Sequence, residues 1–211
     1  MMKTKVLYIH GMGGGGDSRI PAILKSSLTE VDVVVRTYDF DPEKAARQIR
    51  EWIEELKPSL IVGESLGAIQ AIRVKGLPHL LVSPSLNAPL YLGYLSFLAL
   101  IPGVTRMFDR IYKPKDGDRQ RLHFTYDILK KYRQHRREAM ANSVISGSTD
   151  YFYAFFGTKD HYRRTGVVSI RTWRRYFGDD YEIYDGTHFM EEEHVLTRLV
   201  PKILNVLSNN K

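Results

Sequence analysis

One short segment, residues 61–68, constrains the fold more than any other part of this chain. Its sequence, Ile-Val-Gly-Glu-Ser-Leu-Gly-Ala, is a β-branched run followed at once by a G-x-S-x-G pattern and a helix-like stretch. In a nucleophile elbow a serine occupies a strained strand-to-helix turn, and the two flanking glycines let strand and helix pass closely. The pattern predicts such an elbow, with Ser65 raised above the sheet and the backbone N–H of Leu66 aimed at an oxyanion. A βα loop that merely contains Gly63, Ser65 and Gly67 is the alternative.

Apolar strand-like segments alternate with helical patterns on both sides of this elbow. Such alternation, with short turns, is typical of right-handed βαβ units, a parallel sheet, and a site at the carboxyl ends of the strands. Asp41 and Pro42 predict the start of one helix, which Pro58 ends. The predicted strands are 6–9, 31–38, 59–62, 79–82, 151–156 and 181–184, and the predicted helices are 20–28, 42–56, 66–74, 166–177 and 192–207.

The alternation breaks over residues 87–150, which we interpret as a helical insertion. Residues 90–101 are apolar on all sides, 113–119 form a polar loop with Pro and Gly, and 122–141 have the pattern of a basic helix. The apolar run must bury against the body, line an acyl pocket or contact a membrane surface. We expect the insertion to cover the site as a lid, and a surface helical pair without a gating role is the alternative. The expected lid and pocket residues are Leu90, Leu95, Phe97 and Leu98.

The positive charge of the chain is confined to one segment. The net charge is +7 in 211 residues, and residues 106–137 contain eleven Lys and Arg against four Asp. The rest of the chain therefore carries twenty charges of each sign. A neutral body with one basic segment indicates a local surface for an anionic substrate group or a lipid surface, or a solvated helix face. It does not predict a specific nucleic-acid partner.

A glycine-rich stretch after the first predicted strand offers a competing interpretation. Gly11-x-Gly13-x-x-Gly16 fits the dinucleotide fingerprint, and Asp39 lies near the position of a ribose-binding acid. However, the helical pattern begins only after Asp17 and Ser18, and the Asp17 carboxylate would lie where pyrophosphate binds. We therefore expect no nicotinamide or flavin dinucleotide at this loop.

Three strand ends carry the residue types of a nucleophilic catalyst. Ser65, Asp160 and His188 follow three different predicted strands, in that chain order. In a parallel sheet those ends meet at one edge, so the three side chains converge. A serine needs an imidazole to accept its proton and a carboxylate to orient and stabilise that imidazole.

Taken together, these segments resemble the α/β-hydrolase superfamily over nearly the whole chain, and within it the small bacterial YqiA-like serine esterases. The motifs that carry the resemblance are His-Gly-Met at 10–12, Gly-Glu-Ser-Leu-Gly at 63–67, Gly-Thr-Lys-Asp at 157–160 and Gly-Thr-His-Phe at 186–189. The resemblance implies an α/β-hydrolase fold with about six mostly parallel strands in the order 2-1-3-4-5-6. It also implies hydrolysis of an ester or thioester through an acyl-serine, with backbone oxyanion donors from Met12 and Leu66. The insertion is longer and more basic than is expected of that group.

The remaining expectations concern compartment, cofactors and alternative functions. The chain has no cysteine, and no secretory signal is readable at its start, so we expect a cytoplasmic protein. No Cys/His or carboxylate cluster has metal-ligand spacing, and we expect neither metal nor cofactor. Two other functions stay open: a non-catalytic hydrolase-fold binding module, and a protein that binds an anionic polymer or membrane surface through the basic insertion.

Overall fold

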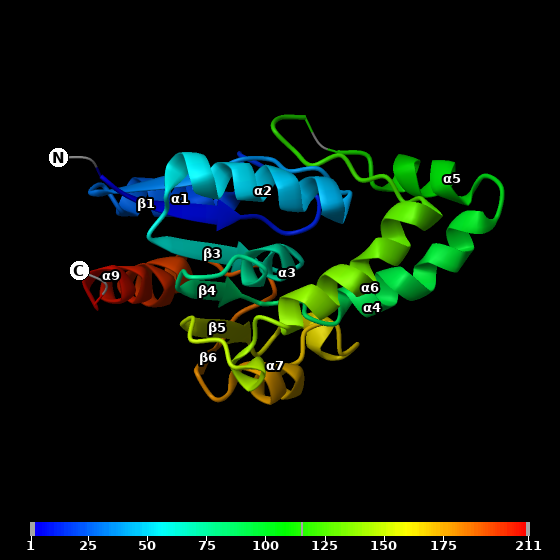
Figure 1. The fold of residues 1–211 in the computed structure, drawn as a ribbon. Helices are drawn as coiled ribbons and strands as arrows, with labels where there is room; N and C mark the ends of the chain where they lie inside the picture. Colours follow the sequence, from blue (N-terminus) through cyan, green and yellow to red (C-terminus); the bar gives the residue numbers. More distant parts are fainter. Residues whose placement is uncertain (1–2, 115, 210–211) are drawn as a thin grey trace.

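A computed structural model describes residues 3–114 and 116–209 of the chain. Its centre is one sheet of six parallel strands in the order β2-β1-β3-β4-β5-β6, which confirms the predicted order (Figure 1). The strands inside the sheet carry apolar runs because both of their faces are covered by helices, whereas the two edge strands are partly exposed. The strands are β1 (Thr4–Ile9), β2 (Val31–Val35), β3 (Leu60–Glu64), β4 (His79–Val82), β5 (Phe152–Gly157) and β6 (Tyr181–Tyr184).

Helices cover the two faces of the sheet, and each face has its own apolar core. One core joins the sheet to α1 (Arg19–Ser27), the π-helical turn η4 (Val195–Leu199) and α9 (Val200–Asn209). The other core lies under four further helices, and Trp173 is its largest fully buried side chain. Those helices are α2 (Pro42–Leu56), α3 (Gly67–Ile72), α6 (Tyr126–Met140) and α7 (Ile170–Phe177).

Several element ends differ from the predicted ones, and each difference has a local cause. β2 ends at Val35 rather than at residue 38, because its partner β1 ends at Ile9 and the last registered pair is Tyr8 with Val35. α7 begins at Ile170 rather than at 166, because the Ser169 hydroxyl accepts a hydrogen bond from the Thr172 N–H and caps it. The last predicted helix is divided into α8 (Glu192–His194), η4 and α9, and α9 restarts one residue before Pro201.

The segment between β4 and β5, which was predicted to be an insertion, is largely helical. It contains α4 (Ala88–Leu95), the 3-10 helix η1 (Ser96–Leu100), α5 (Val104–Ile111), α6, and the 3-10 turn η2 (Val144–Ser146). α6 contacts both α2 and α3, and α4 packs on the outside of α6. The buried Tyr132 of α6 donates a hydrogen bond to the Phe40 carbonyl at 2.7 Å. α6 is therefore part of the body, whereas α4 and α5 form an outer layer.

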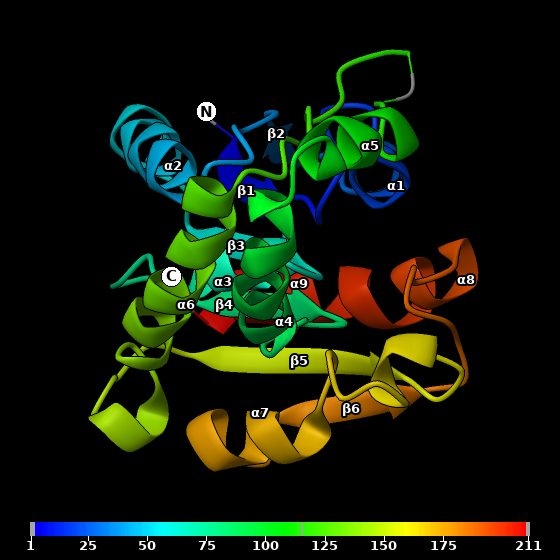
Figure 2. The same ribbon diagram turned by 90° about the vertical axis from the view of Figure 1, so that its right-hand side faces the viewer.

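The carboxyl ends of the strands face the side of the molecule on which the insertion lies. In Figure 1 the arrowheads of β1 and β3 point toward α4 and α6, while α9 lies at the opposite end. Figure 2 looks onto this end and shows α4 and α6 across the middle of the sheet. Within the described residues no helix is long and apolar enough to cross a membrane.

Candidate active site

The turn after β3 has the geometry of a nucleophile elbow. Ser65 has φ of 51°, a left-handed conformation that side-chain-bearing residues rarely adopt. A Cβ on Gly63 would lie 2.8 Å from the Ala71 Cβ, and one on Gly67 would overlap the His10 carbonyl oxygen. Both glycines are therefore needed for α3 to pass close to β3 and to the loop after β1.

The structure brings Ser65, His188 and Asp160 together in one hydrogen-bonded chain. The distance from the Ser65 Oγ to the His188 Nε2 is 2.9 Å, and that from the His188 Nδ1 to the Asp160 Oδ2 is 2.8 Å. Ionised Asp160 can only accept, so Nδ1 carries the proton and Nε2 of the neutral ring accepts from the Ser65 hydroxyl. His188 and Asp160 are buried, and Ser65 is half-buried.

Asp160 is held in place by its own loop. Its second oxygen, Oδ1, accepts a hydrogen bond from the Tyr162 N–H at 2.8 Å, which caps the 3-10 turn η3 (His161–Arg163). The other aspartates near strand ends have other partners: Asp150 accepts from the Gly76 N–H, Asp179 pairs with Arg174, and Asp185 pairs with Lys159. Asp160 is thus the acid that the fold presents to His188.

The loop that carries His188 is fixed from two sides. Arg19, at the start of α1, donates to the carbonyl oxygens of Phe189 and Met190, each at 2.9 Å. The Tyr162 ring packs edge-on against the imidazole of His188, with ring centroids 4.6 Å apart. Neither Arg19 nor Tyr162 was identified from the sequence, because both contacts depend on how distant loops meet.

The two expected oxyanion donors lie on the loops that flank Ser65. Among the described residues, neither the N–H of Leu66 nor that of Met12 donates to a protein acceptor. The loop after β1 approaches the serine closely, since a Cβ on Gly11 would lie 3.0 Å from the Ser65 Cβ. The assignment of Leu66 and Met12 as oxyanion donors stays a prediction.

A second hydroxyl beside Ser65 was not singled out in the sequence. The Ser85 Oγ lies 3.2 Å from the Ser65 Oγ, and the Ser85 N–H donates to the Ser65 carbonyl at 3.0 Å. Ser85 is 3% exposed. The sequence feature that could have identified Ser85 is its position shortly after β4, the strand that pairs with β3.

Glu64 precedes the serine and is buried beside another polar group. Its Oε2 accepts a hydrogen bond of 2.8 Å from the hydroxyl of the fully buried Tyr8. Burial raises the pKa of the Glu64 carboxyl above its ordinary value, although the Tyr8 hydrogen bond and the nearby His188 act in the opposite direction. Glu64 therefore belongs to the electrostatic environment of the site.

The glycine-rich loop after β1 is occupied by side chains of the protein itself. The Gly13 N–H donates to the Gln120 Oε1 at 3.1 Å, and the Gly16 N–H donates to both Thr37 Oγ1 and Asp118 Oδ2. α1 begins at Arg19, after the glycines rather than within them. The Asp118 carboxylate thus lies at the backbone N–H of Gly16, and the expectation of no dinucleotide stays a prediction.

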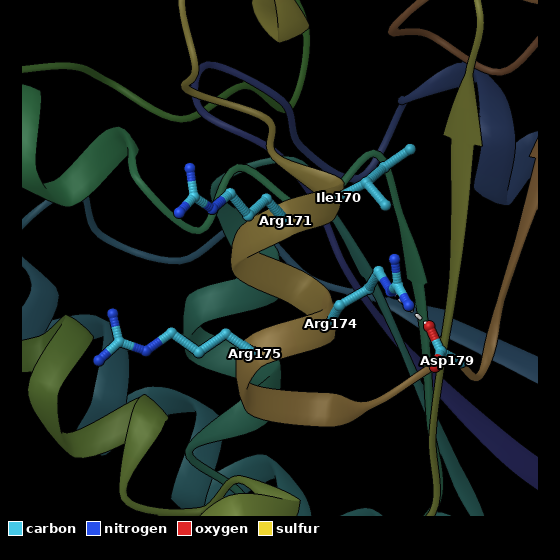
Figure 3. A pocket seen from close by; sticks show the side chains of 5 residues that line it. All are labelled: Ile170, Arg171, Arg174, Arg175 and Asp179. Atoms are coloured by element: carbon cyan, nitrogen blue, oxygen red, sulfur yellow. Dashed lines mark hydrogen bonds and ion pairs between the residues drawn. The ribbon is translucent and has the colours of Figure 1, made fainter.

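The residues expected to line a pocket lie mainly on the outside of the insertion. Leu90 is half-buried, whereas Leu95, Phe97 and Leu98 are exposed. Their role in a substrate pocket stays a prediction. One surface hollow, of about 450 Å³, lies on α7 instead (Figure 3). It is lined by Ile170, Arg171, Arg174, Arg175 and Asp179, and it includes none of the three hydrogen-bonded residues.

In the part of the chain that the structure describes, no group of three or more His, Asp or Glu side chains is arranged to hold a metal ion. No family model matches this sequence, and no curated protein matches it.

Solved structures do match the chain over nearly its whole length. The monoacylglycerol lipase of Paleococcus ferrophilus has 17% identity and a TM-score of 0.65, covering 100% of this chain and 97% of that one. Est1E of Butyrivibrio proteoclasticus, with ferulic acid bound, has 13% identity and a TM-score of 0.62, covering 97% and 90%. NosK of Streptomyces actuosus has 15% identity and a TM-score of 0.60, covering 99% of both chains.

These matches, together with the strand order, show that the chain has the α/β-hydrolase fold. The narrower similarity to the YqiA-like esterases is not tested by them and stays a prediction.

Proposed function

We propose that this protein is a serine hydrolase that cleaves a carboxylic ester or thioester through an acyl-serine intermediate. The observation that carries the proposal is the hydrogen-bonded chain from Ser65 through His188 to Asp160, with Ser65 in the left-handed conformation of an elbow. Both partner side chains are buried and oriented by their loops, so the imidazole is ready to accept a proton.

In the first half of the proposed reaction, the Ser65 Oγ attacks the substrate carbonyl carbon while the His188 Nε2 takes its proton. Asp160 stabilises the resulting imidazolium, and the N–H groups of Leu66 and Met12 bind the negative oxygen of the tetrahedral intermediate. The intermediate collapses, the bond to the alcohol or thiol breaks, and His188 returns the proton to that leaving group.

In the second half, a water molecule attacks the acyl-serine while His188 accepts one of its protons. The new intermediate releases the carboxylic acid, and Ser65 regains its proton from His188. No metal or cofactor is required for either half.

Two of the similar structures support an ester as the substrate. One is a monoacylglycerol lipase and another holds ferulic acid, a carboxylic acid. At 17% and 13% identity these two matches show the fold alone. The carboxylesterase-like activity and the small-molecule ester substrate are therefore part of our proposal.

The test is covalent labelling with a fluorophosphonate, followed by turnover of p-nitrophenyl esters of increasing chain length. Labelling and hydrolysis should both be lost in Ser65→Ala, and His188→Ala should lose at least about a thousandfold in kcat because triad members act as a unit. Ser83→Ala is the matched control, since Ser83 also has a positive φ, of 46°, at the end of the next strand.

Labelling that persists at another serine in Ser65→Ala would show that Ser65 is not the nucleophile. Labelling without turnover of any ester or thioester would favour the alternative of a non-catalytic binding module. A substrate with an anionic group should also lose kcat/KM as salt rises, if the basic segment steers it.

A further inference from the structure

A group of large apolar side chains is exposed where η1 passes into α5. Leu100 is 60% exposed and Ile111 is 64% exposed, which is unusual for aliphatic side chains so close together in sequence. η1 and α5 contact each other in the fold. We call the following set the tip surface: Phe97, Leu98, Leu100, Ile101, Met107 and Ile111, with the cations Arg106, Arg110 and Lys113.

α5 divides its side chains between an inner and an outer side. On the inner side Phe108 packs against Phe124, with ring centroids 5.6 Å apart, and the Asp109 carboxylate lies 2.7 Å from the His123 Nδ1. The outer side carries Arg106, Met107, Arg110 and Ile111, all exposed. The only acid of the helix therefore faces inward, while cations and apolar groups together face outward.

Several cations of the insertion are held by internal contacts. Lys131 pairs with Asp41 at 3.0 Å, Arg119 pairs with Asp17 at 2.7 Å, and Arg136 donates to the Leu86 carbonyl at 2.7 Å. In contrast, Arg106, Arg110 and Lys113 form no ion pair within residues 3–114 and 116–209. Lys115 lies outside the described residues.

The tip surface is at the same end of the molecule as the carboxyl ends of the strands. α4 and α5 lie at the far side from α9 in Figure 1, and in Figure 2 α4 lies in front of the middle of the sheet and α5 in front of α1. A flat surface that meets this tip would therefore meet the end of the molecule at which Ser65 lies.

We propose that the tip surface binds to an anionic lipid bilayer, with its aliphatic and aromatic side chains in the interface and its three cations at the lipid phosphates. Charge complementarity selects this partner, since mixed cationic and apolar helix faces bind anionic interfaces. A second copy of the chain would instead bring two sets of the same three cations together. The inference goes beyond the proposed function, because binding requires no hydrolysis.

The test is co-sedimentation of the full chain with vesicles of equimolar phosphatidylcholine and phosphatidylglycerol, using Ser65→Ala to prevent turnover. We expect binding to these vesicles and at least about tenfold weaker binding to pure phosphatidylcholine vesicles. Leu100→Ser/Ile111→Ser and Arg106→Gln/Arg110→Gln should each weaken binding to the anionic vesicles about tenfold or more.

Two matched variants control for a general loss of apolar area or charge. Ile183→Ser/Leu204→Ser removes aliphatic side chains that are 47% and 49% exposed on β6 and α9, and Arg47→Gln/Arg50→Gln removes cations of α2. Both should bind to the anionic vesicles as the parent does. When the tip substitutions are made in the chain that keeps Ser65, hydrolysis of a water-soluble ester should be unchanged.

The proposal is overturned by absent binding to the anionic vesicles, or by binding that the tip variants leave unchanged. It is also overturned if the parent forms a dimer in sedimentation velocity that the tip variants abolish, because a second copy is then the occupant. Failure of the proposed function, which is a loss of labelling and turnover, would leave these binding results untouched.

Discussion

At the scale of single residues, the hydrogen bonds around Ser65 have only one consistent direction. The Ser65 hydroxyl has one proton, which it donates to the His188 Nε2. The contact of 3.2 Å between the two serine hydroxyls must then run from Ser85 to Ser65. We infer that Ser85 holds the Ser65 oxygen in position, which makes it a positioning residue for the proposed nucleophile.

Replacement of Ser85 tests this inference. We expect Ser85→Ala to lower kcat by about tenfold with little change in KM, which corresponds to the loss of one hydrogen bond of roughly 1.4 kcal/mol. Ser85→Thr keeps the hydroxyl and should recover most of the rate. Stopped-flow measurement of fluorophosphonate labelling should show the same order. Equal labelling rates in all three proteins would mean that Ser85 only packs against the elbow.

At the scale of loops and strands, Gly157 allows the Asp160 loop and the His188 loop to meet. It ends β5, and a Cβ at this position would overlap the carbonyl oxygens of Gly186 and Thr187. These carbonyls lie directly before His188. We therefore expect Gly157→Ala to separate the two loops and to lengthen the hydrogen bond between His188 and Asp160.

The expected result is a loss of about a hundredfold or more in kcat, because small displacements of catalytic groups are costly. The free energy of unfolding, measured with urea, should fall by about 1–3 kcal/mol. Gly147→Ala is the control. Gly147 has φ of 85°, and a Cβ at this position would have no atom within 4 Å, so its variant should lose stability but keep its activity. Equal effects of both variants on kcat would contradict the proposed role of Gly157.

The sequence predicts these elements well where burial alone decides them. β3 and β4 are buried at every residue and largely apolar, so such strands could be predicted from their composition, whereas the strand order followed from the resemblance to the α/β-hydrolase superfamily. The end of a strand could not be predicted as accurately where it depends on the partner strand. β2, for example, ends at Val35 because its partner β1 ends at Ile9.

The same distinction applies to the candidate site. Ser65, Asp160 and His188 follow strands, and parallel strands place such residues at one edge whatever the loops do. Ser85, Arg19 and Tyr162 reach the site through loop conformations that no periodic pattern encodes. The apolar run at 90–101 was equally ambiguous, because only its contact with α6 decides that Leu92 is buried while Leu95 is exposed.

At the scale of the whole molecule, buried histidines should make stability depend on pH. His10 stacks on Tyr38 and His79 stacks on Phe152, and both are fully buried. Burial lowers the pKa of each from 6.5 to about 4, although hydrogen bonds to carbonyl oxygens act in the opposite direction. In the unfolded chain both histidines would have the ordinary pKa of 6.5 and would become protonated as the pH falls below it.

Between pH 6.5 and about 4 the unfolded state therefore binds more protons than the folded state, and stability must fall as the pH falls through this window. From about pH 7 to about pH 5 we expect the free energy of unfolding to decrease by about 1–2 kcal/mol for each of the two histidines. Carboxyl groups with a lowered pKa, such as that of Glu191, contribute only at lower pH. Glu64 opposes the decrease, because burial raises the pKa of its carboxyl.

Urea unfolding at a series of pH values measures this dependence, and two variants assign it. His79→Gln should be less stable than the parent near pH 7, since the His79 ring lies 3.0 Å from the Ala71 carbonyl, but its stability should decrease less toward pH 5. His123→Gln removes an exposed histidine and should keep the full decrease. If His79→Gln and the parent lose the same free energy over this range, the buried ring does not stay neutral in the folded state, and its burial is not the cause of the dependence.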